Sequence, residues 1–208
     1  INVPTYELTV PSSEEKLTFR PFLVKEEKIL LLALEDGSTG ALNQSLKQIV
    51  NNCTFEKLEV NKVPTFDLEY IFLRIRAKSV GETSTISLLA EDDGETYVEV
   101  EVPLEKIEVE FPKGHTNKIT LTDDIGVTMS YLDMTDMYRG MEEGQNAIDF
   151  SMGLIKKSIG QVTEGEVVHE RADFSDKDLE RVKKQFVEGI KAQQKDANYL
   201  AGSRFNKL

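Results

Sequence analysis

The chain has 208 residues, of which 39% are hydrophobic and 30% are charged, so it can bury a core and differs in composition from a disordered chain. Its formal net charge of −12 argues against nucleic acid or an anionic membrane surface as a partner, because both carry negative charge. The one cysteine, Cys53, excludes a disulfide within the chain and is typical of a reducing compartment.

The first elements are predicted to be a β-hairpin and two helices. Apolar and polar side chains alternate over residues 5–10 and 16–20, which predicts two strands joined by a short loop. A helix is expected at 25–34, with Gly37 supplying the left-handed residue that ends it. A second helix is expected at 41–51, where the apolar residues fall at helical spacing.

The strongest helical pattern of the chain covers residues 65–81. One apolar stripe contains Phe66, Tyr70, Leu73 and Ala77, and a second contains Leu68, Phe72 and Ile75. A helix that is apolar on two faces usually packs on both sides, so we expect this one to be central.

The middle of the chain is predicted to form antiparallel strands. Strands are expected at 83–90, 96–102, 118–121 and 125–129, and the alternation after residue 102 continues through Ile107, Val109 and Phe111. Asp93-Gly94 is a hairpin-turn signal. Val98 and Val100 alternate with Glu99 and Glu101, which predicts one buried face and one charged face.

The last third of the chain returns to a helical pattern. Helices are expected at 132–139 and 142–157, followed by a loop or short ribbon at 160–168. Ser175 is expected to cap a long final helix, and the polar tail from residue 193 is expected to be flexible.

These elements predict an α+β fold with an N-terminal β-hairpin, a helical layer, a central antiparallel β module and C-terminal helices. The expected domains are an N-terminal hairpin and helical region at 1–82, the β module at 83–130, and a C-terminal helical region at 131–208. No segment suggests a membrane span, because the longest apolar run, residues 29–34, is far below the about 20 residues required. The first residues lack the pattern of a signal peptide, so none is expected.

The sequence gives little sign of metal or cofactor chemistry. Cys53, His115 and His169 are far apart in the sequence, whereas zinc ligands usually come in closely spaced pairs. We interpret Cys53 as a buried apolar residue and the two histidines as surface residues. No phosphate-binding loop, dinucleotide motif or nucleophile elbow is present, so we expect no catalytic residue, no metal site and no cofactor.

Acidic clusters allow one enzymatic alternative. Residues 91–95 lack the ligand spacing of a calcium loop and are interpreted as a hairpin turn. Asp123-Asp124 and the pair Asp133 and Asp136 could serve as general acid and base, although such residues are common in loops and caps. The alternative is therefore a small hydrolase that uses a carboxylate pair.

Residues 129–141 hold four of the five methionines and two tyrosines. Met, Tyr and Arg are enriched at protein–protein contacts, so this segment is a candidate interaction site. The opposing interpretation is a core helix that links the β module to the last helices. The candidate interaction residues are Tyr131, Met134, Met137, Tyr138, Arg139 and Phe186.

Two stretches carry a resemblance to a known family, namely FRPFLVKEEK at 19–28 and FDLEYIFLRIRAKSVGE at 66–82. In matching order they resemble the baseplate family of T-even-like contractile-tailed bacteriophages, the group of tail hub subunits and hub assembly factors. The resemblance is good over the N-terminal half and weaker beyond about residue 140. Some relatives resemble a small zinc ribbon in having cysteine pairs around the central hairpin, but the matching positions here, near 89–94 and onward, hold no cysteine.

The resemblance implies a non-enzymatic role in building the baseplate hub, as a structural subunit or as an assembly factor. The implied partners are other tail hub proteins, in a homo- or hetero-oligomer. The implied location is the host cytoplasm during assembly, or the virion tail baseplate. With this resemblance, the enzymatic alternative is a small tail-associated hydrolase that uses a carboxylate pair. A cellular adaptor unrelated to phages is the remaining alternative.

Overall fold

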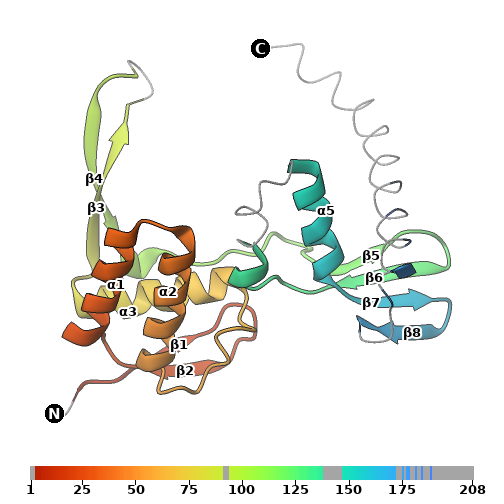
Figure 1. Ribbon diagram of the computed structural model, residues 1–208, viewed down its shortest axis with the longest axis horizontal. Helices are drawn as coiled ribbons and strands as arrows, with labels where there is room; N and C mark the ends of the chain where they lie inside the picture. The colour runs from red at the N-terminus through yellow and green to blue at the C-terminus, as the bar shows by residue number, and fades with distance from the viewer. Residues whose placement is uncertain are drawn as a thin grey trace. The chain divides into compact units, whose positions relative to one another are not determined.

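The computed structural model describes residues 3–90, 94–137 and 147–171, together with positions 175, 177, 178, 181, 184 and 188 (Figure 1). It divides into two compact units. The N-terminal unit comprises residues 1–112 and 133–138, and the C-terminal unit comprises residues 113–132 and 139–208. Helices and antiparallel sheets occur together, so the predicted α+β class is confirmed.

The N-terminal unit begins with an antiparallel hairpin of β1 (Tyr6–Thr9) and β2 (Lys16–Phe19), followed by three helices. These are α1 (Val24–Asp36), α2 (Thr39–Cys53) and α3 (Thr65–Ser79), and each predicted helix is confirmed with its ends shifted by one or two residues. Gly37 adopts the left-handed conformation (φ 73°) and ends α1, as its lack of a side chain allows. Ser38 then caps α2 by accepting a hydrogen bond from the Ala41 N–H at 3.2 Å.

Helix α3 is the centre of the core of this unit. Leu68, Ile71 and Ile75 are fully buried and pack with residues of β1, β2 and α2, which confirms the predicted central position. Asp67 is also buried, and it accepts hydrogen bonds from the backbone N–H (3.1 Å) and the hydroxyl of Ser12. Burial raises the pKa of Asp67, although the bonds from Ser12 oppose this effect. The loop of the β1–β2 hairpin is thereby attached to α3.

A buried ion pair joins the end of β2 to the start of α1. The Arg20 guanidinium lies 3.0 Å from a carboxylate oxygen of Glu26, which is fully buried and also accepts the Leu23 N–H at 2.9 Å. Burial alone would raise the pKa of Glu26. The hydrogen bonds from Arg20 and Leu23, with the positive charge of Arg20, outweigh burial and hold the pKa below its usual value.

The next two strands, β3 (Thr83–Leu89) and β4 (Tyr97–Pro103), pair only with each other in the part of the chain that the structure describes. A short 3-10 helix, η1 (Leu104–Lys106), follows β4. The predicted continuation of the strand pattern through Ile107 and Phe111 is wrong. Arg74 of α3 donates hydrogen bonds to the carbonyl oxygens of Glu105 (2.6 Å) and Ile107 (2.8 Å), so these groups are engaged by a side chain instead of a strand.

The C-terminal unit contains a four-stranded antiparallel sheet in the order β5-β6-β7-β8. Its strands are β5 (Lys118–Thr120), β6 (Ile125–Met129), β7 (Ile159–Glu164) and β8 (Val167–Glu170). Helix α5 (Ala147–Ser158) leads directly into β7, and its Ile155 packs on a core of Val127, Ile159 and Val162. The segment at 160–168, predicted as a loop or ribbon, is therefore a hairpin within this sheet.

The expected β module at 83–130 is not one sheet, and the structure divides the chain elsewhere than at 82 and 130. Strands β3 and β4 belong to the N-terminal unit, whereas β5 and β6 belong to the C-terminal unit. The physical reason is that alternation reveals a strand but does not reveal its partner, and residues of β6 pair with residues of β7 that lie 30 to 39 positions further along the chain.

The predicted helix at 132–139 is a helical turn at 134–137 in the described residues, and it packs on the N-terminal unit. Lys47 of α2 is buried there and donates hydrogen bonds to Asn61 (3.3 Å) and to the hydroxyl of Thr135. Ser175 accepts a hydrogen bond from the Asp178 N–H at 3.3 Å, which confirms the predicted cap. The start of the helix expected from 142 and the tail from 193 lie outside the described residues. No helix among the described residues is long and apolar enough to cross a membrane.

We predict that replacing Glu26 by Gln destabilises the protein. The amide would leave the Arg20 guanidinium nearly buried without its counter-charge, a change that costs about 3–5 kcal/mol in proteins. Unfolding by urea, followed by circular dichroism, measures the loss. Glu27→Gln at the exposed neighbouring position is the matched control and should change the free energy of unfolding by less than about 0.5 kcal/mol. Equal stabilities of the two variants would contradict a structural role for the ion pair.

The contribution of Glu26 should also disappear in acid. Because the native pKa of this group is lowered, its stabilisation is fully present above the unfolded-state pKa and is lost as the pH falls through the native pKa. The free-energy difference between the wild type and Glu26→Gln should therefore be largest at about pH 7 and should shrink towards about pH 3. Urea titrations of both proteins across this range test the prediction, and a difference that is independent of pH would contradict it.

Candidate functional site

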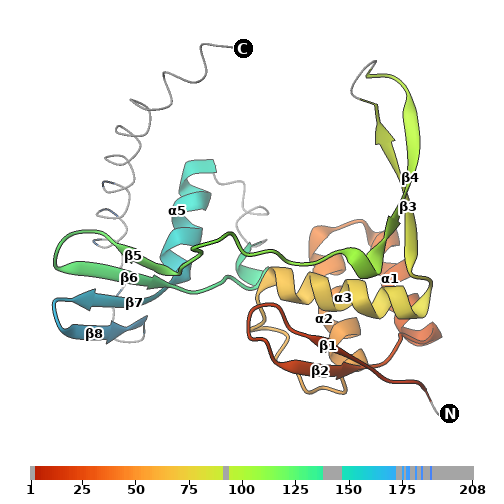
Figure 2. The ribbon, with the colours of Figure 1, turned by 180° about the vertical axis from the view of Figure 1, so that it is seen from behind.

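One face of the β3–β4 hairpin is apolar and uncovered. The register places Ile86 opposite Val100 and Leu88 opposite Val98, so these four side chains lie on the same face. Their exposed fractions are 41% for Ile86, 37% for Val100, 49% for Leu88 and 48% for Val98, values far from those of a core. We call these four residues the hairpin apolar face. In Figures 1 and 2 no described helix or other strand of the N-terminal unit lies against the hairpin over most of its length.

This exposure corrects the expectation that the valine face would be buried. The alternation was read correctly, and the opposite face carries Glu99 and Glu101 as predicted. What is missing among the described residues is a second layer that covers the apolar side. Exposed apolar residues that are contiguous usually mark an interaction site, whereas isolated ones need no explanation.

The base of the hairpin is fixed to α3. The Leu104 N–H donates a hydrogen bond to the Glu82 carbonyl oxygen at 2.8 Å and closes the end of the hairpin. Lys78 of α3 forms ion pairs with Glu82 (2.7 Å) and with Glu105. Hydrogen bonds to Glu105 and Glu82 raise the pKa of Lys78. The apolar face is therefore presented from a base that the core helix holds in place.

A second apolar surface lies on α1. Leu31, Leu32 and Leu34 are each more than half exposed, while Ala33 between them is buried against the helical layer. The apolar run that made this helix conspicuous in the sequence thus extends beyond what the core covers. It is a smaller candidate surface, on a helix whose other exposed side chains have mixed charge.

The sequence-predicted interaction residues do not come together in one described surface. Tyr131 is exposed in the C-terminal unit, where its ring stacks on His115 and its hydroxyl lies 2.9 Å from that imidazole. Met137 is half-buried and Met134 is buried in the core of the N-terminal unit. For Met134 this placement favours the core interpretation. The remaining three candidates, Tyr138, Arg139 and Phe186, lie outside the described residues.

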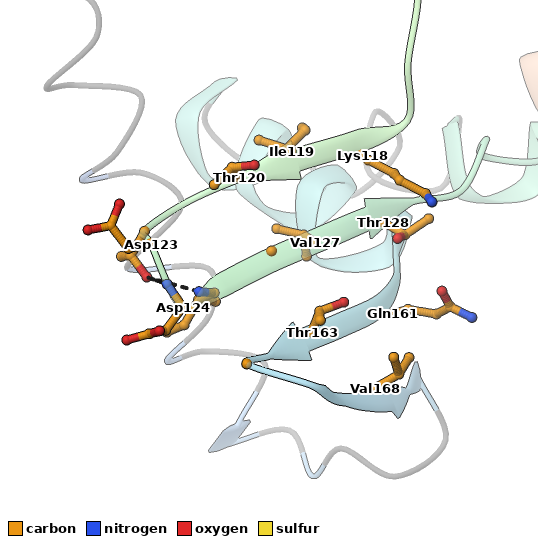
Figure 3. A pocket seen from close by; sticks show the side chains of 14 residues that line it. Lys118, Ile119, Thr120, Asp123, Asp124, Val127, Thr128, Gln161, Thr163 and Val168 are labelled. Atoms are coloured by element: carbon orange, nitrogen blue, oxygen red, sulfur yellow. Dashed lines mark hydrogen bonds between the residues drawn. The ribbon is translucent and has the colours of Figure 1, made fainter.

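The C-terminal unit contains an open hollow of about 390 Å³ over the polar face of its sheet. Figure 3 shows Lys118 near one end of the hollow and Asp123 and Asp124 at the other. The two aspartates occupy the turn between β5 and β6, where the Asp124 N–H donates to the Thr122 hydroxyl at 3.3 Å and the Asp124 carbonyl accepts the Gly165 N–H at 2.8 Å. These contacts are those of turn residues.

The other candidate acids and metal ligands also show no arrangement of a catalytic or metal site among the described residues. Asp133 accepts a hydrogen bond from the Asp136 N–H at 3.0 Å, which is the contact of a helix cap. Glu91 to Asp93 lie outside the described residues. Across the described part of the chain, no group of three or more His, Cys, Asp or Glu side chains is placed to hold a metal ion.

Cys53 is the buried residue that the sequence predicted. Its side chain is fully buried at the end of α2, close to Arg20. Burial raises the pKa of the thiol to about 11, and the nearby Arg20 charge offsets only part of this effect. A thiol in this environment is neither a nucleophile nor a metal ligand at neutral pH.

We therefore predict that Cys53 is unreactive until the protein unfolds. A thiol reagent such as 5,5′-dithiobis(2-nitrobenzoic acid) should label the native protein only at the slow rate of local or global opening, because the thiolate is both scarce and inaccessible. In urea above the unfolding midpoint, one thiol per chain should react at once. Rapid stoichiometric labelling of the native protein would contradict the buried, protonated thiol.

The model of a family described as T4 bacteriophage base plate protein matches residues 3–197 of this chain, which is most of its length. No curated protein matches the chain, and no solved structure matches it.

Proposed function

The chain belongs to the family of T4 bacteriophage base plate proteins, and we propose that within the tail baseplate it works at the hub by binding other tail proteins. Family membership makes it a phage baseplate protein and removes the alternative of an adaptor unrelated to phages. The hub location, and a role as a hub subunit or as a hub assembly factor, are our proposal. It is motivated by the motifs at 19–28 and 66–82.

The observation that carries the protein-binding role is the hairpin apolar face. Ile86, Leu88 and Val98 are about half exposed in a hairpin whose base is held by α3. A protein that acted alone would lose stability by leaving such residues in water, whereas a partner that covers them gains about 25 cal/mol for each Å² of apolar surface buried. The surface therefore suits a protein that completes its packing on assembly.

The rest of the molecule supports a binding function more than a catalytic one. Asp123, Asp124 and Asp133 make the contacts of turn and cap residues. The buried charged residues Arg20 and Glu26 neutralise each other inside the core instead of facing a cleft. The described residues thus form a stable core that holds the hairpin apolar face in an exposed position.

The proposal predicts that the full-length chain forms a complex with at least one other baseplate protein of the phage that encodes it. Each candidate is co-expressed with the chain and the pair is analysed by size-exclusion chromatography with light scattering. Co-elution as a stoichiometric complex is the expected result, because the apolar surface is buried only on association. Elution of the chain alone in every pairing would contradict a hub-binding role.

Mass spectrometry then separates the two proposed roles. A hub subunit should be found both in complexes from infected cells and in purified virions. An assembly factor should be found in the same intracellular complexes but should be absent from virions that contain the hub proteins themselves.

A further inference from the structure

We propose that the β3–β4 hairpin docks, through the hairpin apolar face, onto a surface of another baseplate protein that is apolar at its centre and rimmed by Lys and Arg. This inference rests on the proposed function and adds to it which element binds and what chemistry the partner must present.

The geometry of the hairpin favours docking by its face. Ile86 and Leu88 from β3 lie directly opposite Val100 and Val98 from β4, which brings branched aliphatic side chains together into one patch. An isolated two-stranded hairpin is only marginally stable in water, because it lacks a packed layer. A partner that lies on this patch would supply that layer and would stabilise the strands at the same time.

The charge of the same segment specifies the chemistry of the partner. Between residues 82 and 103 there are seven acidic residues and neither Lys nor Arg. These acids are Glu82, Glu91, Asp92, Asp93, Glu95, Glu99 and Glu101. They make up more than half of the formal net charge of −12 of the whole chain. An interface with an apolar centre and an acidic periphery is complemented by a basic rim on the partner.

The positions of the described acids fit this arrangement. Glu99 and Glu101 point to the face opposite the apolar patch and are exposed, so a docked hairpin would leave them in water on its outer face instead of burying them. Glu82, at the base, is already paired with Lys78 of the same chain. The hairpin can therefore be attracted by Lys and Arg side chains without the cost of desolvating its carboxylates.

Charge also argues against the other occupants. A second copy of the chain would bring an equally acidic hairpin to the same contact, and like charges in an interface cost binding energy. An anionic membrane or a nucleic acid would be repelled for the same reason. The charged residues around the exposed leucines of α1 are of both signs, so that surface gives no comparable indication of the charge of a partner.

Two adjacent leucines provide a matched test. Leu88 belongs to the hairpin apolar face, whereas Leu89 points to the opposite face, and their exposed fractions are 49% and 48%. Each is replaced by Thr in the full-length protein, because Thr keeps a high propensity for strands. Because both positions are exposed, neither substitution should change the urea concentration at the midpoint of unfolding, and this measurement verifies that the fold is retained. The purified baseplate proteins of the encoding phage are then titrated one by one into wild type and variants by calorimetry.

Leu88→Thr should weaken binding of the responding baseplate protein by about tenfold or more, and Leu89→Thr by no more than about twofold. Equal affinities of the two variants for a protein that binds the wild type would overturn the docking face and leave the proposed function standing. Binding of none of the baseplate proteins by the wild type would instead overturn the proposed function. Self-association that Leu88→Thr abolishes would identify a second copy as the occupant and would overturn the proposal.

A second pair of variants tests the basic rim. Glu99→Gln with Glu101→Gln removes two charges from the hairpin, and Glu164→Gln with Glu166→Gln removes two exposed charges from the C-terminal unit. The net charge changes equally in both. The hairpin variant should associate about tenfold more slowly at low salt and should show a weaker dependence of the association rate on salt, whereas the control should stay within about twofold of wild type. Indistinguishable rates for the two variants would overturn the basic rim.

Discussion

The N-terminal unit depends on the charge balance between Arg20 and Glu26 inside its core. Around this pair, the backbone of one short segment is hydrogen-bonded to two other elements, α2 and α3. The Arg20 N–H donates to the Cys53 carbonyl oxygen of α2 at 2.9 Å, and the Phe22 N–H donates to the Ser79 hydroxyl of α3 at 2.9 Å. A buried charge without an opposite charge beside it would destabilise the fold. The pairing of Arg20 with Glu26 therefore allows the hairpin and the helices to share one core.

Helix α3 connects this core to the exposed β3–β4 hairpin. Its inner side contributes Leu68 and Ile75 to the core, and its outer side contributes Arg74 and Lys78 to the base of the β3–β4 hairpin. The two stretches that carry the family resemblance are thus joined in space, since Phe22 of the first contacts Ser79 of the second. The two motifs, which are separate in the sequence, therefore pack together and hold the base of the β3–β4 hairpin, the element that we propose to bind a partner.

Periodicity was sufficient to predict most of the helices and strands, but it could not predict what lies against them. The spacing of apolar residues located α3 and both strands of the β3–β4 hairpin, because these patterns depend on local geometry alone. Burial of the acids Glu26 and Asp67 was missed, since their partners Arg20 and Ser12 satisfy them only after the chain has folded. The candidate site was missed for a related reason. Alternation at β4 implied a covering layer, and only the structure showed that no described element of the N-terminal unit supplies it.

The uncovered hairpin also has a consequence for the time before assembly. Two apolar strands with open edges are a template for aggregation, and proteins commonly protect such strands with flanking charges that act as gatekeepers. Residues 82–103 contain acidic side chains and neither Lys nor Arg, which would protect the strands in this way, because repulsion between copies opposes edge-to-edge pairing. If Lys and Arg of a partner neutralise the same carboxylates, this repulsion would fall on docking, so that protection against self-association and recognition of the partner would depend on the same side chains.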